Sequence, residues 1–268
     1  LTSSNLTRTN VEMVIENESS GNYLCIGEID HVPSPPPNNE NAIMYEIDRN
    51  VGSLVWEKTY TSRDEFSRAV VYQDNLFITG QFDLSSPNTV RASLSRFDLS
   101  GNEIWSRIYL KPFVETAYLL GVDLVYDDGA LYAIAFGNLD QATFNGGSIK
   151  FFKTDLAGNI EWAKNYEVMG AIRTDATRLI TLPDGFLITG YSTDANNTGA
   201  NGFMIKTSKS GEYQWSKILT IPDAATLIYT PLFYEGNIYF SGLQYSFVGS
   251  DWDLLFAKVS LDGKLDFP

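Results

Sequence analysis

The chain has 268 residues and a formal net charge of −14, with 19 Lys and Arg against 33 Asp and Glu. Binding of a phosphate backbone needs dense Lys and Arg, so this balance argues against nucleic acid and anionic membranes as partners. No apolar run approaches the length of a membrane span, so we expect no membrane insertion.

A hairpin signature returns roughly every fifty residues, a period typical of arrays and propellers. Its best example runs from Arg96 to Trp105, where an alternating strand leads through a tight Asp and Gly turn into a strand that carries Trp. The marker glycines are Gly52, Gly101, Gly158, Gly211 and Gly263. Four residues after each of them stands a large aromatic: Trp56, Trp105, Trp162, Trp215 and Phe267.

The residues that precede each marker glycine have turn chemistry. Asp98 and Asp155 stand three residues before their glycines, and Ser208 and Ser260 replace Asp in the later copies. A short oxygen-bearing side chain accepts hydrogen bonds from the turn backbone, while glycine adopts positive φ without a steric cost. We therefore assign these residues a structural role in the repeat, and no catalytic one.

A second hairpin signal runs in step with the first. Its turn dipeptides are Ser20-Gly21, Asp74-Asn75, Asp128-Gly129, Asp184-Gly185 and Glu235-Gly236. Dipeptides of this kind between apolar runs indicate hairpins, so each unit holds two hairpins and four strands. Short apolar runs such as 76–80 suit strands that are buried on both faces. The sequence predicts an all-β propeller with five four-stranded blades in a single domain, residues 1–268.

In chain order, the repeat units are expected at 11–60, 61–110, 111–166, 167–219 and 220–268. An integral number of periods separates the two ends, which favours a closed ring in which residues before Val11 brace the last blade. Closure would leave no free strand edge. The alternative is part of a ring with six to eight blades. We expect the single cysteine, Cys25, to pack as a small apolar side chain in a buried strand.

The two faces of the predicted ring differ. The first-to-second and third-to-fourth strand turns are tight, whereas the second-to-third loops vary in length and composition. Binding sites concentrate on variable loops held by a rigid scaffold, so we expect a site on the variable-loop face near the axis. The candidate binding residues there are four acids and three aromatics: Asp30, Asp83, Asp140, Asp194, Tyr191, Tyr245 and Trp252.

The four acids follow the second strand of their blades at similar positions. A ring of carboxylates at one height suits a cation, calcium included, or sugar hydroxyls. The aromatics suit stacking on a sugar or anchoring of a protein partner. We assign no metal site and no required cofactor, because the same acids also serve as ordinary strand ends.

Catalytic motifs are scarce. The one histidine, His31, lies beside a proline-rich loop and cannot build a histidine metal cluster, and the sequence has no phosphate-binding glycine loop. Catalysis by a pair of carboxylates remains an alternative, because glycoside hydrolysis needs only two suitably placed acids.

The Asp-x-x-Gly-x-x-x-Trp pattern of 98–105 and 155–162 resembles the repeats of the quinoprotein-like superfamily and of secreted or surface-anchored bacterial repeat proteins. The resemblance implies that Trp docks between neighbouring blades. It does not carry over a quinone site, because the cofactor-binding residues of those enzymes have no counterpart in this sequence. Since the chain begins at Leu1 rather than Met, we expect an upstream signal or anchor, and a secreted, periplasmic or cell-surface location.

The leading hypothesis is a non-enzymatic binding or scaffold propeller that recognises a protein or a glycan through its variable-loop face. The alternative is a carboxylate-dependent glycan hydrolase, since a five-bladed ring also resembles some lectins and glycosidases in architecture. A hydrolase requires acids that converge in a pocket, one of them with a raised pKa. A scaffold lacks that convergence. The sequence leaves the oligomeric state open.

Overall fold

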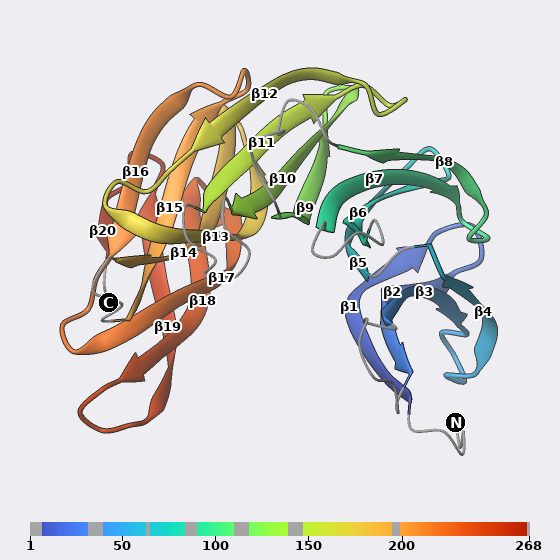
Figure 1. Ribbon diagram of the computed structural model, residues 1–268, viewed down its shortest axis with the longest axis horizontal. Helices are drawn as coiled ribbons and strands as arrows, with labels where there is room; N and C mark the ends of the chain where they lie inside the picture. Colours follow the sequence, from blue (N-terminus) through green and yellow to red (C-terminus); the bar gives the residue numbers. More distant parts are fainter. Residues whose placement is uncertain are drawn as a thin grey trace.

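The computed structural model describes residues 7–31, 40–62, 65–83, 90–109, 118–138, 147–194 and 199–266. The chain forms five four-stranded antiparallel sheets, each with its strands side by side in chain order. Figure 1 shows these sheets arranged around a common centre as the blades of a propeller. The all-β fold and the five four-stranded blades predicted from the sequence are thus confirmed.

The blades are numbered in chain order. Blade 1 contains β1 (Thr7–Asn17), β2 (Asn22–His31), β3 (Glu40–Ile47) and β4 (Leu54–Tyr60). Blade 2 contains β5 (Glu65–Tyr72), β6 (Asn75–Asp83), β7 (Val90–Asp98) and β8 (Glu103–Ile108). Blade 3 contains β9 (Tyr118–Asp127), β10 (Ala130–Asn138), β11 (Ser148–Thr154) and β12 (Ile160–Tyr166). Blade 4 contains β13 (Ala171–Leu182), β14 (Gly185–Asp194), β15 (Ala200–Ser208) and β16 (Tyr213–Leu219). Blade 5 contains β17 (Ala224–Tyr234), β18 (Asn237–Ser246), β19 (Trp252–Ser260) and the short β20 (Leu265–Asp266).

In blades 1 to 4, the two middle strands are the buried part of the sheet. In β6, Leu76, Phe77 and Ile78 are all almost completely buried, although alternate residues point to opposite faces of the sheet. Such a strand is covered by a neighbouring blade on each side. The thiol of Cys25 in β2 is likewise buried, and burial raises its pKa. Within the described ranges, no helix is long and apolar enough to cross a membrane.

The tight turns have the chemistry that the sequence indicates. At the third-to-fourth strand turn of blade 2, the Asp98 carboxylate accepts hydrogen bonds from the backbone N–H groups of Ser100 and Asn102, at 2.9 and 2.8 Å. Gly101 follows with a φ of 73°, a conformation that costs glycine little. The turn is thus closed by local hydrogen bonds, and Tyr60 of blade 1 adds one more by donating to the Gly101 carbonyl at 2.7 Å.

Neighbouring blades meet along seams built from the marker residues. The aromatic ring of Trp56 lies on Gly101 of the next blade, and Trp105 lies on Gly158 in the same way. Trp162 and Trp215 repeat this contact with Gly211 and Gly263. Beside Trp105, the Tyr109 hydroxyl donates to the Gly158 carbonyl at 3.0 Å. At each of these four seams, the recurring Trp is thus the residue through which the fourth strand of one blade packs on the next blade.

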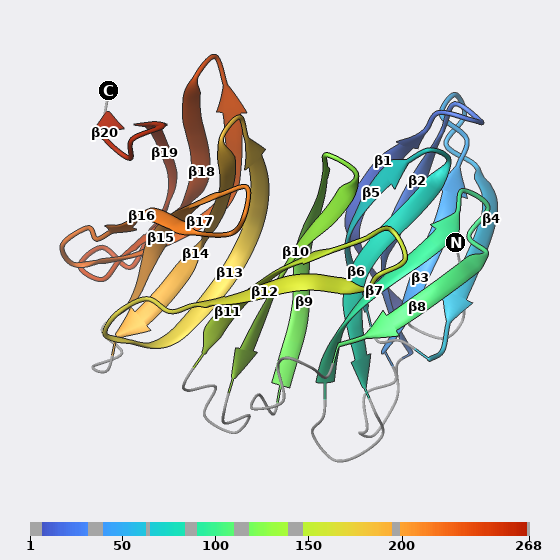
Figure 2. The same ribbon diagram turned by 90° about the horizontal axis from the view of Figure 1, so that it is seen from above.

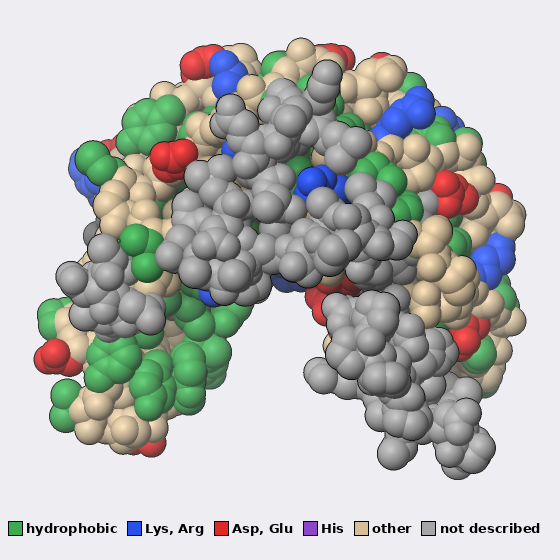
Figure 3. All heavy atoms as spheres, viewed as in Figure 1, with side chains coloured by type: hydrophobic (Ala, Val, Ile, Leu, Met, Phe, Trp, Pro, Cys, Tyr) green, Lys and Arg blue, Asp and Glu red, His purple; other side chains and the backbone are tan. Residues whose placement is uncertain are grey.

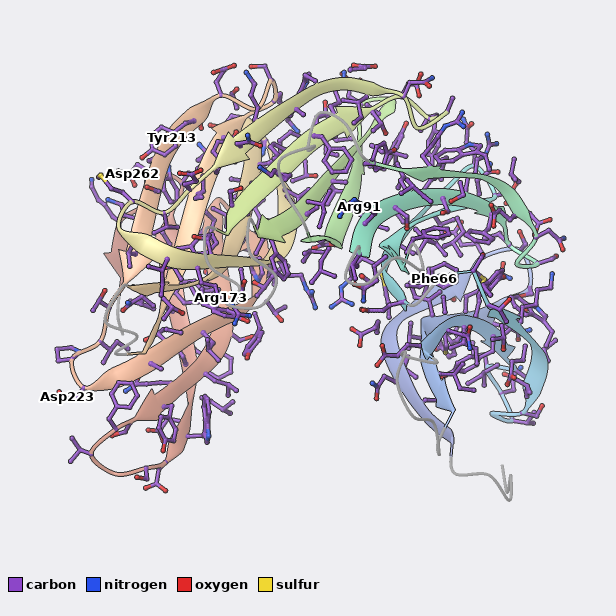
Figure 4. All side chains as sticks on the ribbon, in the orientation of Figure 1. Phe66, Arg91, Arg173, Tyr213, Asp223 and Asp262 are labelled. Atoms are coloured by element: carbon purple, nitrogen blue, oxygen red, sulfur yellow. The ribbon has the colours of Figure 1, made fainter. Side chains whose placement is uncertain are left out.

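Apolar clusters fill the space between the blades. Figure 4 places Phe66 where blades 1 and 2 meet, and there it packs in one cluster with Met44 of blade 1 and Phe97 of its own blade. Blades 3 and 4 share a cluster that includes Phe151 and Phe186, with ring centroids 5.4 Å apart. Since large aromatics bury so much apolar area, these seams dominate the stability of the fold.

The expectation of a closed ring is wrong for this structure. The blades form an open arc, and Figures 1 and 3 show a wide mouth between blade 1 and blade 5. Residues 7–10 do not brace the last blade, because they extend β1, where Thr9 and Asn10 pair with Ile29 and Glu28. Residues 1–6 lie outside the described part of the chain. Seen from above in Figure 2, blades 1 and 5 stand at opposite ends of the arc.

Candidate functional site

The first strand of every blade carries a β-bulge at the same place. The strand registers shift between Val11 and Met13 in β1 and between Phe66 and Arg68 in β5, and the same shift recurs in β9, β13 and β17. The residues left out of the ladder are Glu12, Ser67, Val122, Thr177 and Tyr229. A bulge twists its strand and re-aims nearby side chains, and bulges often lie next to active sites.

A polar pocket of about 200 Å³ lies along these bulged strands. We call it the axial pocket, because the first strands of blades 1 to 4 supply most of its wall. Its residues are Glu12, Glu65, Ser67, Arg68, Gln81, Leu120, Gly121, Val122, Phe136, Ala176 and Arg178. Glu65 pairs with Gln81, close to the end of β6, so this wall lies at the end of the blade where the second-to-third loop emerges.

Two neighbouring carboxylates act on Glu65 at the pocket. Burial is the main reason that the pKa of Glu65 rises to about 7, and the negative charges of Glu28 and Glu12 raise it further. The Gln81 amide donates a hydrogen bond to Glu65, and the Ser67 hydroxyl lies 3.4 Å from the Glu65 carboxylate. Glu65 is thus a carboxylic acid that exchanges its proton near neutral pH instead of near pH 4.5.

Glu12 stands opposite a cation. The Arg68 guanidinium lies 3.6 Å from the Glu12 carboxylate and donates to the Glu12 backbone carbonyl at 2.6 Å. The Glu12 carboxylate is partly exposed, whereas Arg68 is mostly buried. The pocket therefore offers one acid that keeps its proton up to about pH 7 and one carboxylate whose charge is compensated by arginine.

A buried aspartate joins the blades behind the pocket. Asp123 of β9 accepts hydrogen bonds from the backbone N–H groups of Leu124 and, across the seam, Leu179, both at 2.9 Å. Complete burial raises the pKa of Asp123 to about 6, although these bonds and the charges of Arg178 and Arg68 lower it. We assign Asp123 a structural role, because its oxygens are occupied by backbone.

A second ionic group lies on β13 and β14. Arg173, labelled in Figure 4, donates to the Asp175 carboxylate at 2.6 Å. Burial is the main cause that raises the pKa of Asp175. Burial, followed by the charge of Asp175, raises the pKa of Tyr191 to about 12. Among the predicted binding residues whose side chains the structure describes, Tyr191 is the one that lies in a polar network.

The predicted acids mark strand ends. Asp30, Asp83 and Asp194 are at or next to the last residues of β2, β6 and β14, and their side chains lie outside the described part of the structure. Asp140 falls wholly outside the described residues. The described residues contain no group of three or more His, Cys, Asp or Glu arranged to hold a metal ion. A calcium site formed by these four acids therefore stays a prediction.

The other two predicted aromatics lie together but away from the pocket. Tyr245 and Trp252 are cross-strand partners on β18 and β19, with ring centroids 4.9 Å apart. They belong to blade 5, whereas the axial pocket is lined by blades 1 to 4. The structure thus separates the predicted aromatics from the acidic site. His31 is the last residue of β2.

Sequence reasoning missed Glu12, Glu28 and Glu65. A signal was present, because Glu65 and Arg68 lie within the first strand of blade 2, and Asp123 interrupts the corresponding strand of blade 3. A charged residue inside a strand that is packed on both faces is unusual and points to a site. The bulge that directs these residues has no marker of comparable clarity in the sequence.

No protein-family model matches the sequence, and no curated protein matches it. Solved structures do share its fold. Drosophila semaphorin 1a matches with a TM-score of 0.55 and 9% identity, over 94% of this chain and 53% of that chain. A β-fructofuranosidase from Bombyx mori matches with a TM-score of 0.52 and 10% identity, over 90% of this chain. A β-1,2-mannobiose phosphorylase from Listeria innocua matches with a TM-score of 0.52 and 8% identity, over 95% of this chain and 91% of that chain.

This chain spans 58% of the length of the β-fructofuranosidase. At identities of 8 to 10%, these likenesses show the fold alone. They place the chain among propeller-type folds, and they do not test the resemblance to quinoprotein-like repeats.

Proposed function

We propose that the chain is a carboxylate-dependent glycoside hydrolase that binds a carbohydrate in the axial pocket. The observation that carries this proposal is the convergence of Glu12 and Glu65 in one pocket, with the pKa of Glu65 raised to about 7. This convergence is the feature that separates a hydrolase from a plain scaffold, so we prefer the enzyme alternative to the binding scaffold that leads on sequence alone.

Glu65 has the properties of a general acid. A carboxyl group that stays protonated near neutral pH can donate its proton to the oxygen of the bond that breaks. Its partner in glycoside hydrolysis is an ionised carboxylate, which either attacks the sugar or activates a water molecule. We assign that role to Glu12, because Arg68 lies 3.6 Å from its carboxylate and compensates its charge.

Gln81 suits the recognition of a sugar hydroxyl. The Gln81 amide nitrogen donates to Glu65, and its buried oxygen has no hydrogen-bond partner among the described residues. A sugar hydroxyl that donates to this oxygen would satisfy it. A buried polar atom without a partner is costly, so a ligand that pairs with it gains affinity.

The names of two structural relatives fit this proposal. The β-fructofuranosidase was solved in complex with sucrose, and the phosphorylase with β-1,2-mannobiose. Both relatives act on saccharides with a propeller-type fold. They support the class of substrate and say nothing about which residues of this chain react, because fold does not determine function.

The test is hydrolysis of a panel of labelled oligosaccharides and polysaccharides by the wild type and by Glu65→Gln and Glu12→Gln. We expect each substitution to lower kcat by at least about a hundredfold, the range typical for loss of a general acid. Glu212→Gln is the matched control, because Glu212 is an exposed carboxylate on the outer part of blade 4. Equal activity of all four proteins, or no hydrolysis by any, would contradict the proposal.

A binding function is the second candidate, and the paired rings of Tyr245 and Trp252 favour it. Trp252 is largely exposed, and exposed aromatic pairs stack on sugars or anchor protein partners. Binding to a glycan array that persists in Glu65→Gln and disappears in Trp252→Ala would support this candidate. Binding lost in Glu65→Gln alone would instead assign recognition to the axial pocket.

A further inference from the structure

Blade 5 exposes the face that the other four blades bury. We call the side of a blade that meets the next blade its front face, and the opposite side its back face. One front-face position stands seven residues before the marker glycine, or eight residues before it in blade 1. In blades 1 to 4 this position is occupied by Met44, Leu94, Phe151 and Met204, and each of these side chains is 0% exposed. Phe256 holds the same position in blade 5 and is 66% exposed.

The residues around Phe256 continue this apolar surface. Leu254 on β19 and Leu232 on β17 are largely exposed as well. A hollow of about 520 Å³ lies beside them, lined by residues such as Leu232, Tyr239 and Phe256. Soluble monomers rarely expose a contiguous apolar patch of this kind unless it has a partner.

Blade 1 carries the complementary half of a seam on its back face. One back-face position stands two residues after the bulge in the first strand of each blade. In blade 1 this position is Val14, and in blades 2 to 4 it is Ala69, Leu124 and Leu179. Those three are each 2% exposed, because the preceding blade covers them, whereas Val14 is 56% exposed.

The turn of blade 1 also lacks its partner. Gly101, Gly158, Gly211 and Gly263 each have a Trp ring of the preceding blade within van der Waals distance of a Cβ built there. No described atom lies within 4 Å of the corresponding point on Gly52, although the backbone has the same positive φ, 68°. The two ends of the arc are thus the front half and the back half of one type of interface.

We propose that these two halves join between molecules, so that the front face of blade 5 docks on the back face of blade 1 in a second copy of this chain. The contact continues an interface that the chain already forms four times within itself. It is heterologous, so each association leaves one front face and one back face available for another copy.

A second copy fits better than the chain's own first blade. Figures 1 and 2 place blades 1 and 5 on opposite sides of the mouth, and closing the mouth would require movement at the four internal seams. Those seams are fixed by buried apolar clusters and by Trp rings packed on backbone. Close-packed interfaces of this kind resist deformation.

Sedimentation velocity over a range of protein concentrations tests the proposal. We expect the wild type to gain mass with concentration, and Phe256→Asp and Val14→Asp each to stay monomeric, with a dissociation constant raised at least about tenfold. Met169→Lys is the control, because Met169 is 95% exposed on a turn outside both faces, and it should associate like the wild type.

Mixing the two monomeric variants gives the decisive result. Phe256→Asp keeps an intact back face and Val14→Asp an intact front face, so an equimolar mixture should form a one-to-one dimer. A wild type that is monomeric at every concentration would overturn the proposal, as would a mixture that stays monomeric. Circular dichroism checks that each variant is folded, and Leu254→Lys replaces Phe256→Asp if that variant is not.

Discussion

The indole ring of Trp105 lies against the backbone of Gly158 on the next blade, so close that a Cβ on Gly158 would stand 2.8 Å from the ring. The contact joins a fourth strand to a turn more than fifty residues later, and it recurs at the other seams. The regular spacing of Trp and Gly along the sequence is therefore the spacing of interfaces between blades.

Gly158→Ala tests that contact. Alanine is strained at the positive φ of Gly158, which costs about 1 kcal/mol. Its methyl group would also push against the ring of Trp105, and overpacking of this kind costs about 1–3 kcal/mol more. We expect a lower free energy of unfolding in urea denaturation, with the slope unchanged.

Gly129→Ala is the control for Gly158→Ala. Gly129 has a φ of 79°, and no described atom lies within 4 Å of a Cβ built on it. This variant should show the backbone strain alone and lose about 1 kcal/mol. An equal loss in the two variants would mean that the ring does not press on the turn.

Glu46→Leu tests a buried acceptor in blade 1. Burial acts to raise the pKa of Glu46, but hydrogen bonds from Ser20, Asn22 and the Trp56 indole lower it overall. Leucine would leave these donors without an acceptor, at a cost of about 2–3 kcal/mol in the free energy of unfolding. Glu57→Leu, at an exposed position on β4, should change it by less than about 0.5 kcal/mol.

The raised pKa of Glu65 predicts a specific pH dependence of stability. Its pKa is about 7 in the folded chain against 4.5 for an unperturbed glutamate, so the folded state binds the proton more tightly. The contribution of Glu65 to stability is complete below pH 4.5 and is lost as the pH rises through 7. Glu65→Gln should remove this fall, which we expect to be about 3 kcal/mol.

Urea midpoints measured at about pH 4.5 and at about pH 8 check this prediction. The wild type should lose more stability between these values than Glu65→Gln does. Glu212→Gln serves as the control, since its exposed carboxylate should leave the pH dependence of the wild type unchanged. A Glu65→Gln curve parallel to the wild type would show that Glu65 is not buried as described.

Asp123→Ala tests the aspartate that joins blades 3 and 4. The substitution removes the acceptor for the backbone N–H groups of Leu124 and Leu179 and the negative charge near Arg178. Loss of one partner from a buried ionic group costs about 3–5 kcal/mol. Asp123→Asn keeps one oxygen acceptor and should cost less, while the exposed Asp253→Ala should cost less than about 0.5 kcal/mol. Thermal or urea unfolding separates the three variants.

The blades could be predicted from the sequence because the information is local. Asp98 and Gly101 close their hairpin through bonds within a few residues, and Trp105 is rare enough to reveal the period. The open mouth could not be predicted in this way. Whether the arc closes depends on the angle at each seam, and that angle is set by packing such as that of Phe151 on Phe186.

The candidate site could not be predicted from local sequence patterns, for a related reason. Glu12 and Glu65 lie in different blades and meet only because both first strands line the axial pocket. Acids that directly follow the apolar run, such as Asp83, were easier to find. The structure places Glu65, the cross-strand partner of Gln81, one strand away from that position.

The bulges also determine how this wall can change over time. Glu12, Ser67 and Val122 differ in charge and size, although each lines the axial pocket and stands outside the hydrogen-bonded ladder of its own strand. A replacement at one of them leaves the pairing on either side intact. Selection can therefore revise the lining of the axial pocket one residue at a time, while the architecture that surrounds it is inherited unchanged.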